Sequence, residues 1–272
     1  AGYLLESHSF PNGFAYCFVV AFCLQVGSWV FLAMVREPED PVAEEATSFR
    51  RYLADLPSIL RSDRNFELYL ISSIVLSLGA LGSPFYIVAA ISELEPSGEL
   101  IGLFTALYMG GQAFTNVLWG LLGDRYGHKR VLQLGAILEL STSALAAFAS
   151  SASAYGLVFL LSGISASALI ISGLSIVLEF STPEKRPIYV GLMNTLRSPF
   201  QALAPLLGGA LADAVRFRTI FLIGAAIIAM GLTLLLLVRD PRRAIAPKTE
   251  LSSEAAVSPS HATQHPSPDR RL

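Results

Sequence analysis

Seven long apolar runs, separated by short charged segments, dominate this chain of 272 residues. Each run has the length of about 20 residues that a helix needs to cross a ~30 Å hydrocarbon core. Continuous apolar residues, unlike alternating ones, indicate helices, and lipid offers no partner to an unpaired backbone group. The pattern therefore predicts an all-α membrane protein, a polytopic helical bundle with seven transmembrane helices. The runs cover residues 14–35, 68–91, 100–122, 131–150, 155–178, 188–212 and 219–238.

Charged residues are scarce and almost absent from the runs. They make up 15% of the chain, against about 25% in soluble domains, and only Glu139 and Arg197 lie within a run. With a formal net charge of −2, the composition excludes a soluble enzyme, a nucleic-acid-binding protein and a secreted disulfide scaffold. Cys17 and Cys23 both lie in the first run, where we expect buried small apolar side chains rather than a disulfide or a metal site.

The Lys and Arg residues between the runs indicate which side faces the cytoplasm. Taken alternately, one set of connections, together with the C-terminal tail, holds 16 of them, whereas the other set holds Arg216 and Arg218. Cytoplasmic segments carry the excess of positive residues. We therefore expect an integral protein of the plasma (inner) membrane, with the N-terminus of this chain outside and its C-terminus in the cytoplasm.

Two of the cytoplasmic segments are longer than simple turns. Segment 36–67 is expected to contain an amphipathic helix at the membrane surface, because its apolar residues fall on one helical face. Those residues are Phe49, Tyr52, Leu53, Leu56 and Leu60. Segment 239–272 is expected to be a disordered tail, because most of it is rich in Ser, Pro, Ala and Thr and has no apolar period.

The connection between the third and fourth runs carries the most specific motif. Its sequence is Trp119-Gly120-Leu121-Leu122-Gly123-Asp124-Arg125-Tyr126-Gly127-His128-Lys129-Arg130. Asp124-Arg125-Tyr126 is the tripeptide of rhodopsin-like receptors, so a seven-span receptor or signalling protein is the alternative interpretation. Such a receptor has a Cys at the outer start of span three and a Pro and a Tyr in span seven, and this chain has none of them at those places.

The whole loop instead resembles the signature Gly-x-x-x-Asp-Arg-x-Gly-x-Lys/Arg-Arg of the major facilitator superfamily (MFS) of transporters. His128 stands where the family more often has Arg. Gly120 is expected to allow a close approach of helices, and Gly127 to permit a turn with positive φ. Asp124 is expected to accept hydrogen bonds from the N-terminus of a neighbouring helix. The matching positions are Gly120, Asp124, Arg125, Gly127, Lys129 and Arg130.

Arg125 of this loop is expected to pair with a carboxylate at the inner end of another span, and Glu179 is the candidate. In the family that the loop resembles, contacts of this kind hold the inner side closed and break when it opens. The alternative is that the basic residues of the loop are ordinary anchors on the cytoplasmic side.

The resemblance implies twelve spans in two six-span bundles, joined by a long cytoplasmic loop. If 36–67 is that loop, the seven runs correspond to family spans six to twelve. The chain is then expected to be a fragment, the C-terminal portion of a transporter, whose partner is the missing N-terminal bundle. The expected division is 1–35, an outer segment and the last helix of the N-terminal bundle; 36–67, the inter-bundle loop; 68–238, the C-terminal six-helix bundle; and 239–272, the tail.

Polar residues inside the runs are candidates for a solute path, because polar groups in hydrocarbon usually face a cavity or one another. Two helical faces carry them, and by the family's plan both helices border the central cavity. For Arg197 the alternative is a purely structural partner, such as a backbone carbonyl of a broken helix. The candidates are Asn194, Arg197 and Gln201 in the sixth run and Gln112 and Asn116 in the third.

Glu139 is the single acidic residue inside the runs. Its carboxyl group is a candidate for proton coupling, but the corresponding family helix is usually peripheral, so the alternative is a bond to a neighbouring helix. The resulting prediction is a secondary transporter that moves a small solute by alternating access. An ion gradient is expected to drive it, since the sequence has no G-x-x-x-x-G-K-[ST] nucleotide-binding loop.

Several negative expectations accompany this prediction. The chain is not expected to be an enzyme, to hold a cofactor or a metal, or to bind nucleic acid. Its expected partners are the lipid bilayer, the solute and the N-terminal bundle. A half-length protein that dimerises to complete a transporter is a third possibility, against which seven spans argue, because two copies would place fourteen helices in a twelve-helix plan.

Overall fold

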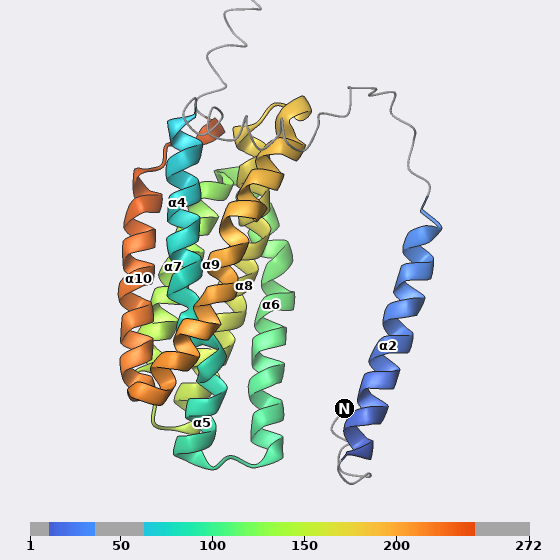
Figure 1. Ribbon diagram of the computed structural model, residues 1–272, viewed down its shortest axis with the longest axis vertical. Helices are drawn as coiled ribbons and strands as arrows, with labels where there is room; N and C mark the ends of the chain where they lie inside the picture. Colours follow the sequence, from blue (N-terminus) through green and yellow to red (C-terminus); the bar gives the residue numbers. More distant parts are fainter. Residues whose placement is uncertain (1–10, 36–62, 243–272) are drawn as a thin grey trace, which may run out of the picture. The chain divides into compact units, whose positions relative to one another are not determined.

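The computed structural model describes residues 11–35 and 63–242, and all regular structure in these two ranges is helical (Figure 1). This confirms the all-α class that the apolar runs predict. The helices are α2 (Asn12–Ala33), α4 (Arg64–Gly79), α5 (Tyr86–Leu94), α6 (Gly98–Tyr126), α7 (His128–Ala146), α8 (Ala152–Phe180), α9 (Arg186–Ala214) and α10 (Phe217–Leu237), with the 3₁₀ segments η1 (Ala80–Phe85) and η2 (Pro183–Lys185).

Helix α2 belongs to a unit of its own and coincides with the first apolar run. Large apolar side chains such as Phe18, Phe22 and Trp29 are exposed along it. Cys17 is half-buried and Cys23 is exposed, and both thiols are free. On this helix taken by itself, the expected burial of the two cysteines is therefore not found.

Within the described residues, four helical segments are long and apolar enough to cross a membrane: Ala15–Ala33, Arg64–Leu94, Ala152–Phe180 and Phe217–Leu237. The other three runs also form helices, α6, α7 and α9. Polar residues such as Gln112, Glu139 and Arg197 lower the hydropathy of these three helices. The number of seven transmembrane helices therefore stays a prediction.

Helix α4 begins inside the segment 36–67 that was expected to be a loop. The side chain of Asp63 caps it, since Oδ1 of Asp63 accepts from the backbone N–H of Phe66 at 3.0 Å. The first helical residue is therefore Arg64. Residues 49–60, which were expected to form the amphipathic helix, lie outside the described part of the chain, as does the tail beyond residue 242.

The second apolar run is interrupted in its middle rather than forming one regular helix. The α-helix ends at Gly79, and η1 follows before α5 begins. Pro84 lies in η1, and its ring nitrogen has no hydrogen to donate to the preceding turn. Helix α9 approaches this interruption closely, because a Cβ atom at Gly208 would lie 2.2 Å from the carbonyl oxygen of Leu81.

Helices α4 and α6 to α10 form a bundle, in which α6 and α7 both pack on α8, and α10 packs on α4 and α7 (Figure 1). Glycines bring these helices together. A Cβ atom at Gly163 of α8 would lie 2.1 Å from the carbonyl oxygen of Tyr108 on α6. A Cβ atom at Gly135 of α7 would lie 2.9 Å from the Cβ atom of Ala168 on α8. Close helix packing of this kind is typical of membrane bundles.

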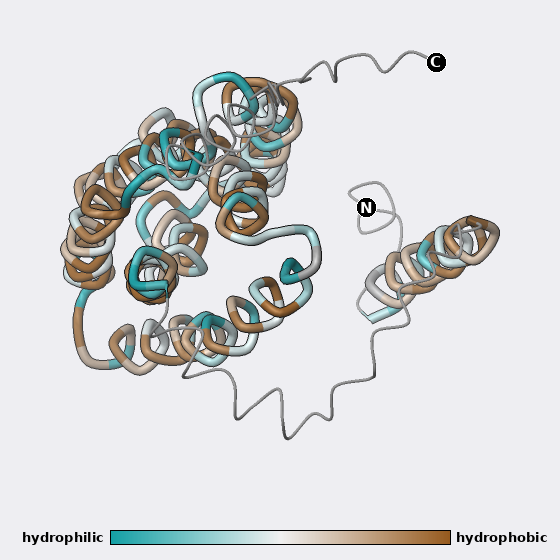
Figure 2. The backbone as a smooth tube through the Cα atoms, turned by 90° about the horizontal axis from the view of Figure 1, so that it is seen from above, coloured by the Kyte–Doolittle hydropathy of each residue, from teal (hydrophilic) through white to brown (hydrophobic). Residues whose placement is uncertain are grey.

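The outer surface of the bundle is apolar. Phe114, Leu222 and Leu237 are among the large apolar side chains that the bundle exposes, and hydrophobic segments recur along the helices when the bundle is seen from above (Figure 2). Soluble proteins rarely expose contiguous apolar patches of this extent. The surface is therefore suited to a hydrocarbon environment rather than to water.

Candidate functional site

A partly polar cavity lies inside the bundle, between helices that are distant in sequence. It consists of two adjoining hollows of about 280 and 550 Å³. Their walls come from α4, η1, α7, α8 and α9, with α10 contributing to the smaller hollow and α5 and α6 to the larger one. The residues that line both hollows are Leu76, Ala80, Ser83, Pro84, Leu169 and Arg197.

Arg197 of α9 is the cation of this cavity. Its Nε atom donates to the hydroxyl oxygen of Ser77 on α4 at 2.7 Å, and the Ser77 hydroxyl donates to the carbonyl oxygen of Ser73 at 2.8 Å. The guanidinium is half-buried and borders both hollows. The sequence left open whether Arg197 lines a cavity or bonds a structural partner, and Arg197 does both. The partner is a hydroxyl group rather than a backbone carbonyl.

Glu139 of α7 is the carboxylate of the larger hollow. Only 8% of the residue is exposed. The hydroxyl group of Ser165 on α8 lies 2.6 Å from Oε2 of Glu139 and 3.2 Å from the carbonyl oxygen of Gly135. Glu139 thus bonds a neighbouring helix, which was the alternative to proton coupling, and also borders the cavity, although its helix was expected to be peripheral.

The structure divides the other predicted solute-path residues into two groups. Gln201 lines the smaller hollow, whereas Gln112, Asn116 and Asn194 do not line either one. Oδ1 of Asn116 instead accepts from the hydroxyl group of Ser167, which joins α6 to α8. Ser73, Ser77 and Thr105 also border the hollows, although none of them was among the predicted residues. The spacing of four residues between Ser73 and Ser77, which puts both on one helical face, was the available signal.

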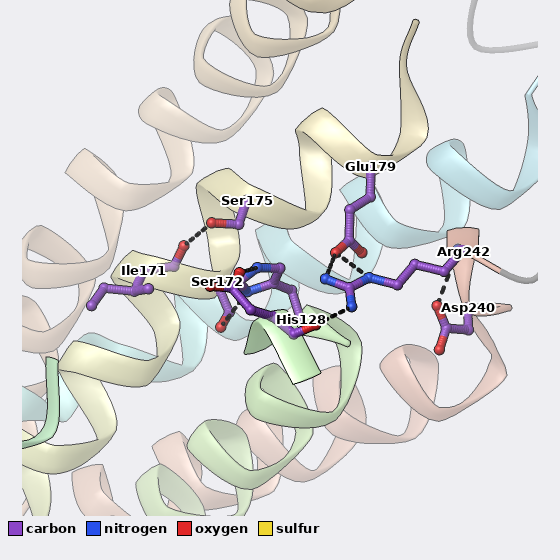
Figure 3. Close-up of polar contacts among 8 residues, drawn as sticks. His128, Ile171, Ser172, Ser175, Glu179, Asp240 and Arg242 are labelled. Atoms are coloured by element: carbon purple, nitrogen blue, oxygen red, sulfur yellow. Dashed lines mark hydrogen bonds and ion pairs between the residues drawn. The ribbon is translucent and has the colours of Figure 1, made fainter. Parts of the chain in front are cut away.

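A second polar cluster lies at the end of the bundle where α6 and α8 finish and α7 begins (Figure 3). Nε of Arg242 donates to Oε1 of Glu179 at 2.7 Å, and Nη1 of Arg242 donates to the carbonyl oxygen of Asp124 at 2.7 Å. Arg242 lies just beyond α10, so one guanidinium joins the ends of three helices. The expected partner of Glu179 was wrong: Glu179 pairs with Arg242, whereas Arg125 is exposed and lies over the ring of Tyr126.

His128 takes the place in the signature loop where Arg was expected, and its side chain is buried. It is 5% exposed, and Nδ1 lies 3.2 Å from the hydroxyl oxygen of Ser172. Oδ1 of Asp124 lies 3.6 Å from Nε2 of His128, which is beyond ordinary hydrogen-bond length. Among the described residues no helix N-terminus donates to the Asp124 carboxylate, which differs from the expectation.

Three glycines of the loop have different roles. Gly127 has φ of +94°, as the loop pattern predicts. A Cβ atom at Gly123 would lie 2.3 Å from two ring atoms of His128, so Gly123 makes room for that ring. The expected close approach at Gly120 is not found within the described ranges, where a Cβ atom at Gly120 would meet nothing within 4 Å.

Comparison with known proteins identifies the family. The model of the Major Facilitator Superfamily matches residues 73–268. The chain belongs to this superfamily. The match covers the signature loop, the Arg242 cluster and every cavity-lining residue except Tyr69. It favours the transporter interpretation of Asp124-Arg125-Tyr126 over the receptor interpretation. MFS proteins are integral membrane proteins, in agreement with the apolar helices of this chain.

Several curated relatives are named for resistance to, or efflux of, toxic compounds. The chain is 30% identical to Multidrug resistance protein 3 of Bacillus subtilis over 47% of this chain and 25% of the relative. It is 34% identical to the multidrug efflux pump LfrA of Mycolicibacterium smegmatis over 46% of this chain and 24% of the relative. It is 30% identical to the methyl viologen resistance protein SmvA of Salmonella typhimurium over 58% of this chain and 29% of the relative. The chain therefore spans less than a third of the length of these relatives.

Proposed function

We propose that this MFS chain forms one bundle of a secondary active transporter that moves a small organic solute by alternating access. The observation that carries the proposal is the cavity in which Arg197 and Glu139 are the charged residues of an otherwise apolar and hydroxyl-lined wall. Charged groups are costly within a membrane and usually mark the path of a solute or an ion. Gln201 and Tyr108 add further hydrogen-bonding groups to this path.

Protons are the proposed driving ion, and Glu139 is the proposed carrier. The Ser165 hydroxyl has one hydrogen but lies within reach of two acceptors, the carboxylate of Glu139 and the carbonyl oxygen of Gly135. When Glu139 is ionised, the hydroxyl can donate to the carboxylate. When Glu139 is protonated, it can donate to Ser165, whose hydroxyl then donates to Gly135. Both protonation states can thus be hydrogen-bonded without any movement of the helices.

The Arg242 cluster is proposed to act as a contact that closes one side of the transporter. It joins the ends of α6 and α8 to the segment after α10, so a change in the spacing of these helix ends as the transporter opens would have to break it. Asp124 and Glu179 are proposed to act in this contact, with Arg242 added by the structure, and Gly127 is proposed to set the turn beside it. Arg125 is exposed over the ring of Tyr126 and lies outside the contact. The unequal distribution of Lys and Arg supports a cytoplasmic location for this end.

The proposed partner of the bundle is a second bundle, as the family's plan implies. Segment 36–67 would connect the two, and α2 would belong to the other one. The relatives' names, which include a multidrug efflux pump, support efflux of toxic organic compounds as the direction and purpose of transport. Methyl viologen, for which one relative is named, is the first solute to test.

The experiment is transport by the intact protein in proteoliposomes with an imposed pH gradient. Accumulation of methyl viologen should follow the gradient and vanish when a protonophore collapses it. Glu139→Gln should reduce gradient-driven accumulation at least tenfold, by the loss of a proton-carrying group. The matched control is Glu99→Gln, which removes an exposed carboxylate from the first turn of α6 and should transport normally. Normal proton-driven transport by Glu139→Gln would exclude Glu139 as the carrier, and transport of none of a panel of organic solutes would contradict the proposed function itself.

A further inference from the structure

A third hollow, separate from the cavity, lies on the outside of the bundle where α7 begins and α10 ends. Its volume is about 680 Å³. It lies at the boundary of the apolar region, because α10 is a membrane-spanning candidate that ends at Leu237. The residues that line it are Lys129, Arg130, Gln133, Leu236, Leu237, Val238, Arg239 and Asp240.

Positive charge exceeds negative charge in this hollow. Lys129, Arg130 and Arg239 face a single acidic residue, Asp240. Oδ1 of Asp240 already accepts from the backbone N–H of Arg242 at 3.2 Å. In the part of the chain that the structure describes, the ion pairs include neither Arg130 nor Arg239. Nζ of Lys129 has a long hydrogen bond of 3.4 Å to the carbonyl oxygen of Leu236.

The start of α7 adds to this positive potential. Among the described residues no side chain caps its N-terminus, and its first turn contains Lys129 and Arg130 and no acidic residue. The N-terminus of a helix carries a partial positive charge, so two cations beside it add to the positive potential. The carboxylate of Asp240 lies close to Gly127, the residue before α7, and offsets part of this charge. An anion bound in the hollow would offset more of it.

The backbone at the far side of the hollow is held in place. Nδ2 of Asn65 donates to the carbonyl oxygen of Arg239 at 2.8 Å, and the N–H of Arg239 donates to Oδ1 of Asn65 at 2.7 Å. These two bonds fix Arg239 at the end of α10 beside the start of α7. Because the backbone at Arg239 is already fixed, only its side chain has to be ordered when a ligand binds.

The same hollow also has an apolar wall. Leu236 and Leu237 are 57% and 65% exposed, and both line it next to the basic residues. A free inorganic anion would gain nothing from these side chains, whereas an amphiphile would bury them. We propose that this hollow binds an anionic phospholipid, with the headgroup phosphate against Lys129, Arg130 and Arg239 and an acyl chain along Leu236 and Leu237. This inference does not depend on the proposed transport activity.

The test is the binding of lipid to the intact protein in detergent, measured by native mass spectrometry. Dioleoyl phosphatidylglycerol is compared with dioleoyl phosphatidylcholine, and inorganic phosphate is added as a competitor. The variant Arg130→Gln with Arg239→Gln should weaken phosphatidylglycerol binding roughly thirtyfold, on the usual contribution of a basic residue near anionic lipid. The matched control is Lys185→Gln with Arg186→Gln, which removes two exposed basic residues that do not line the hollow and should bind within about twofold of the parent.

Each result decides between a lipid site and its alternatives. Selective binding of phosphatidylglycerol that the first variant loses and the control retains supports the proposal. Equal losses in both variants, unchanged binding in the first, or equal binding of phosphatidylcholine would overturn it. Displacement of the lipid by millimolar phosphate would indicate a free-anion site instead. The melting temperature of each variant without lipid shows whether it is folded. If the double variant does not fold, the single variant Arg239→Gln replaces it and should weaken binding about fivefold.

Discussion

Nε of Arg242 donates to Oε1 of Glu179 at 2.7 Å, and this pair joins the segment after α10 to the end of α8. The Glu179 side chain is 14% exposed and that of Arg242 38% exposed. The other carboxylate oxygen, Oε2 of Glu179, is buried and has no hydrogen-bond partner among the described residues. The carboxylate therefore depends on Arg242 for compensation of its charge.

Arg242→Gln should consequently lower the free energy of unfolding by about 1–3 kcal/mol, because it leaves a mostly buried carboxylate without its cation. Glu179→Gln should cost less, since the guanidinium can reach water. The double variant should lose less than the sum of the two single variants. Unfolding in sodium dodecyl sulfate measures all three, with exposed Arg186→Gln as the control. Additive losses would mean that the two side chains are not coupled.

The glycines of the signature loop provide a second prediction. Gly127 has φ of +94°, and a Cβ atom there would also lie 3.3 Å from Oδ2 of Asp240. Gly127→Ala should therefore cost about 1–2 kcal/mol of unfolding free energy. Gly120→Ala is the matched control, because a Cβ atom there meets nothing within 4 Å and alanine favours the helix interior by up to about 1 kcal/mol. Equal effects of the two substitutions on the melting temperature would contradict the assigned roles.

His128 and Gly123 should be coupled through their close contact. A methyl group at Gly123 would lie 2.3 Å from the buried His128 ring, so Gly123→Ala should destabilise by the about 1–3 kcal/mol that is usual for overpacking. His128→Ala removes the ring and makes space for that methyl group. The double variant should be more stable than the sum of the single losses predicts, which thermal unfolding in detergent can measure. Losses that simply add would show that the cost of Gly123→Ala does not come from contact with the His128 ring.

The helices could be predicted from the sequence because apolar runs and capping residues act locally. Pro84 was a local signal that the second run is interrupted. The run is nevertheless long enough for one spanning helix, so its length alone did not predict the interruption. The partner of Glu179 could not be predicted, because a choice between Arg125 and Arg242 depends on how the ends of separate helices meet. For the same reason Gly120 and Gly123 could not be distinguished, since their roles depend on which of them faces the His128 ring.

The candidate cavity was predictable only in part. Helical spacing placed Asn194, Arg197 and Gln201 on one face of α9, but two of the three line the hollows. Whether a residue on a helical face reaches a cavity depends on how the helix is rotated and bent within the bundle. Pro199 and Pro205 lie inside α9, where proline can kink a helix. The sequence could show that Glu139 was unusual, but only the packing of α7 on α8 brings Ser165 to it.

Gln201 and Asn194 of α9 differ in whether they line the cavity. Gln201 lines the smaller hollow, whereas Asn194, about two turns earlier, is exposed and lines neither hollow. Gln201→Leu should raise the KM of solute transport about fivefold, which corresponds to the loss of roughly one hydrogen bond to the bound solute. Asn194→Leu makes a similar change of polarity on the same helix and should leave KM within about twofold of the parent. Initial rates in proteoliposomes over a range of solute concentrations distinguish the two variants. If Asn194→Leu raised KM and Gln201→Leu did not, the solute would have to bind nearer to the start of α9 than the smaller hollow does, at the level of Asn194.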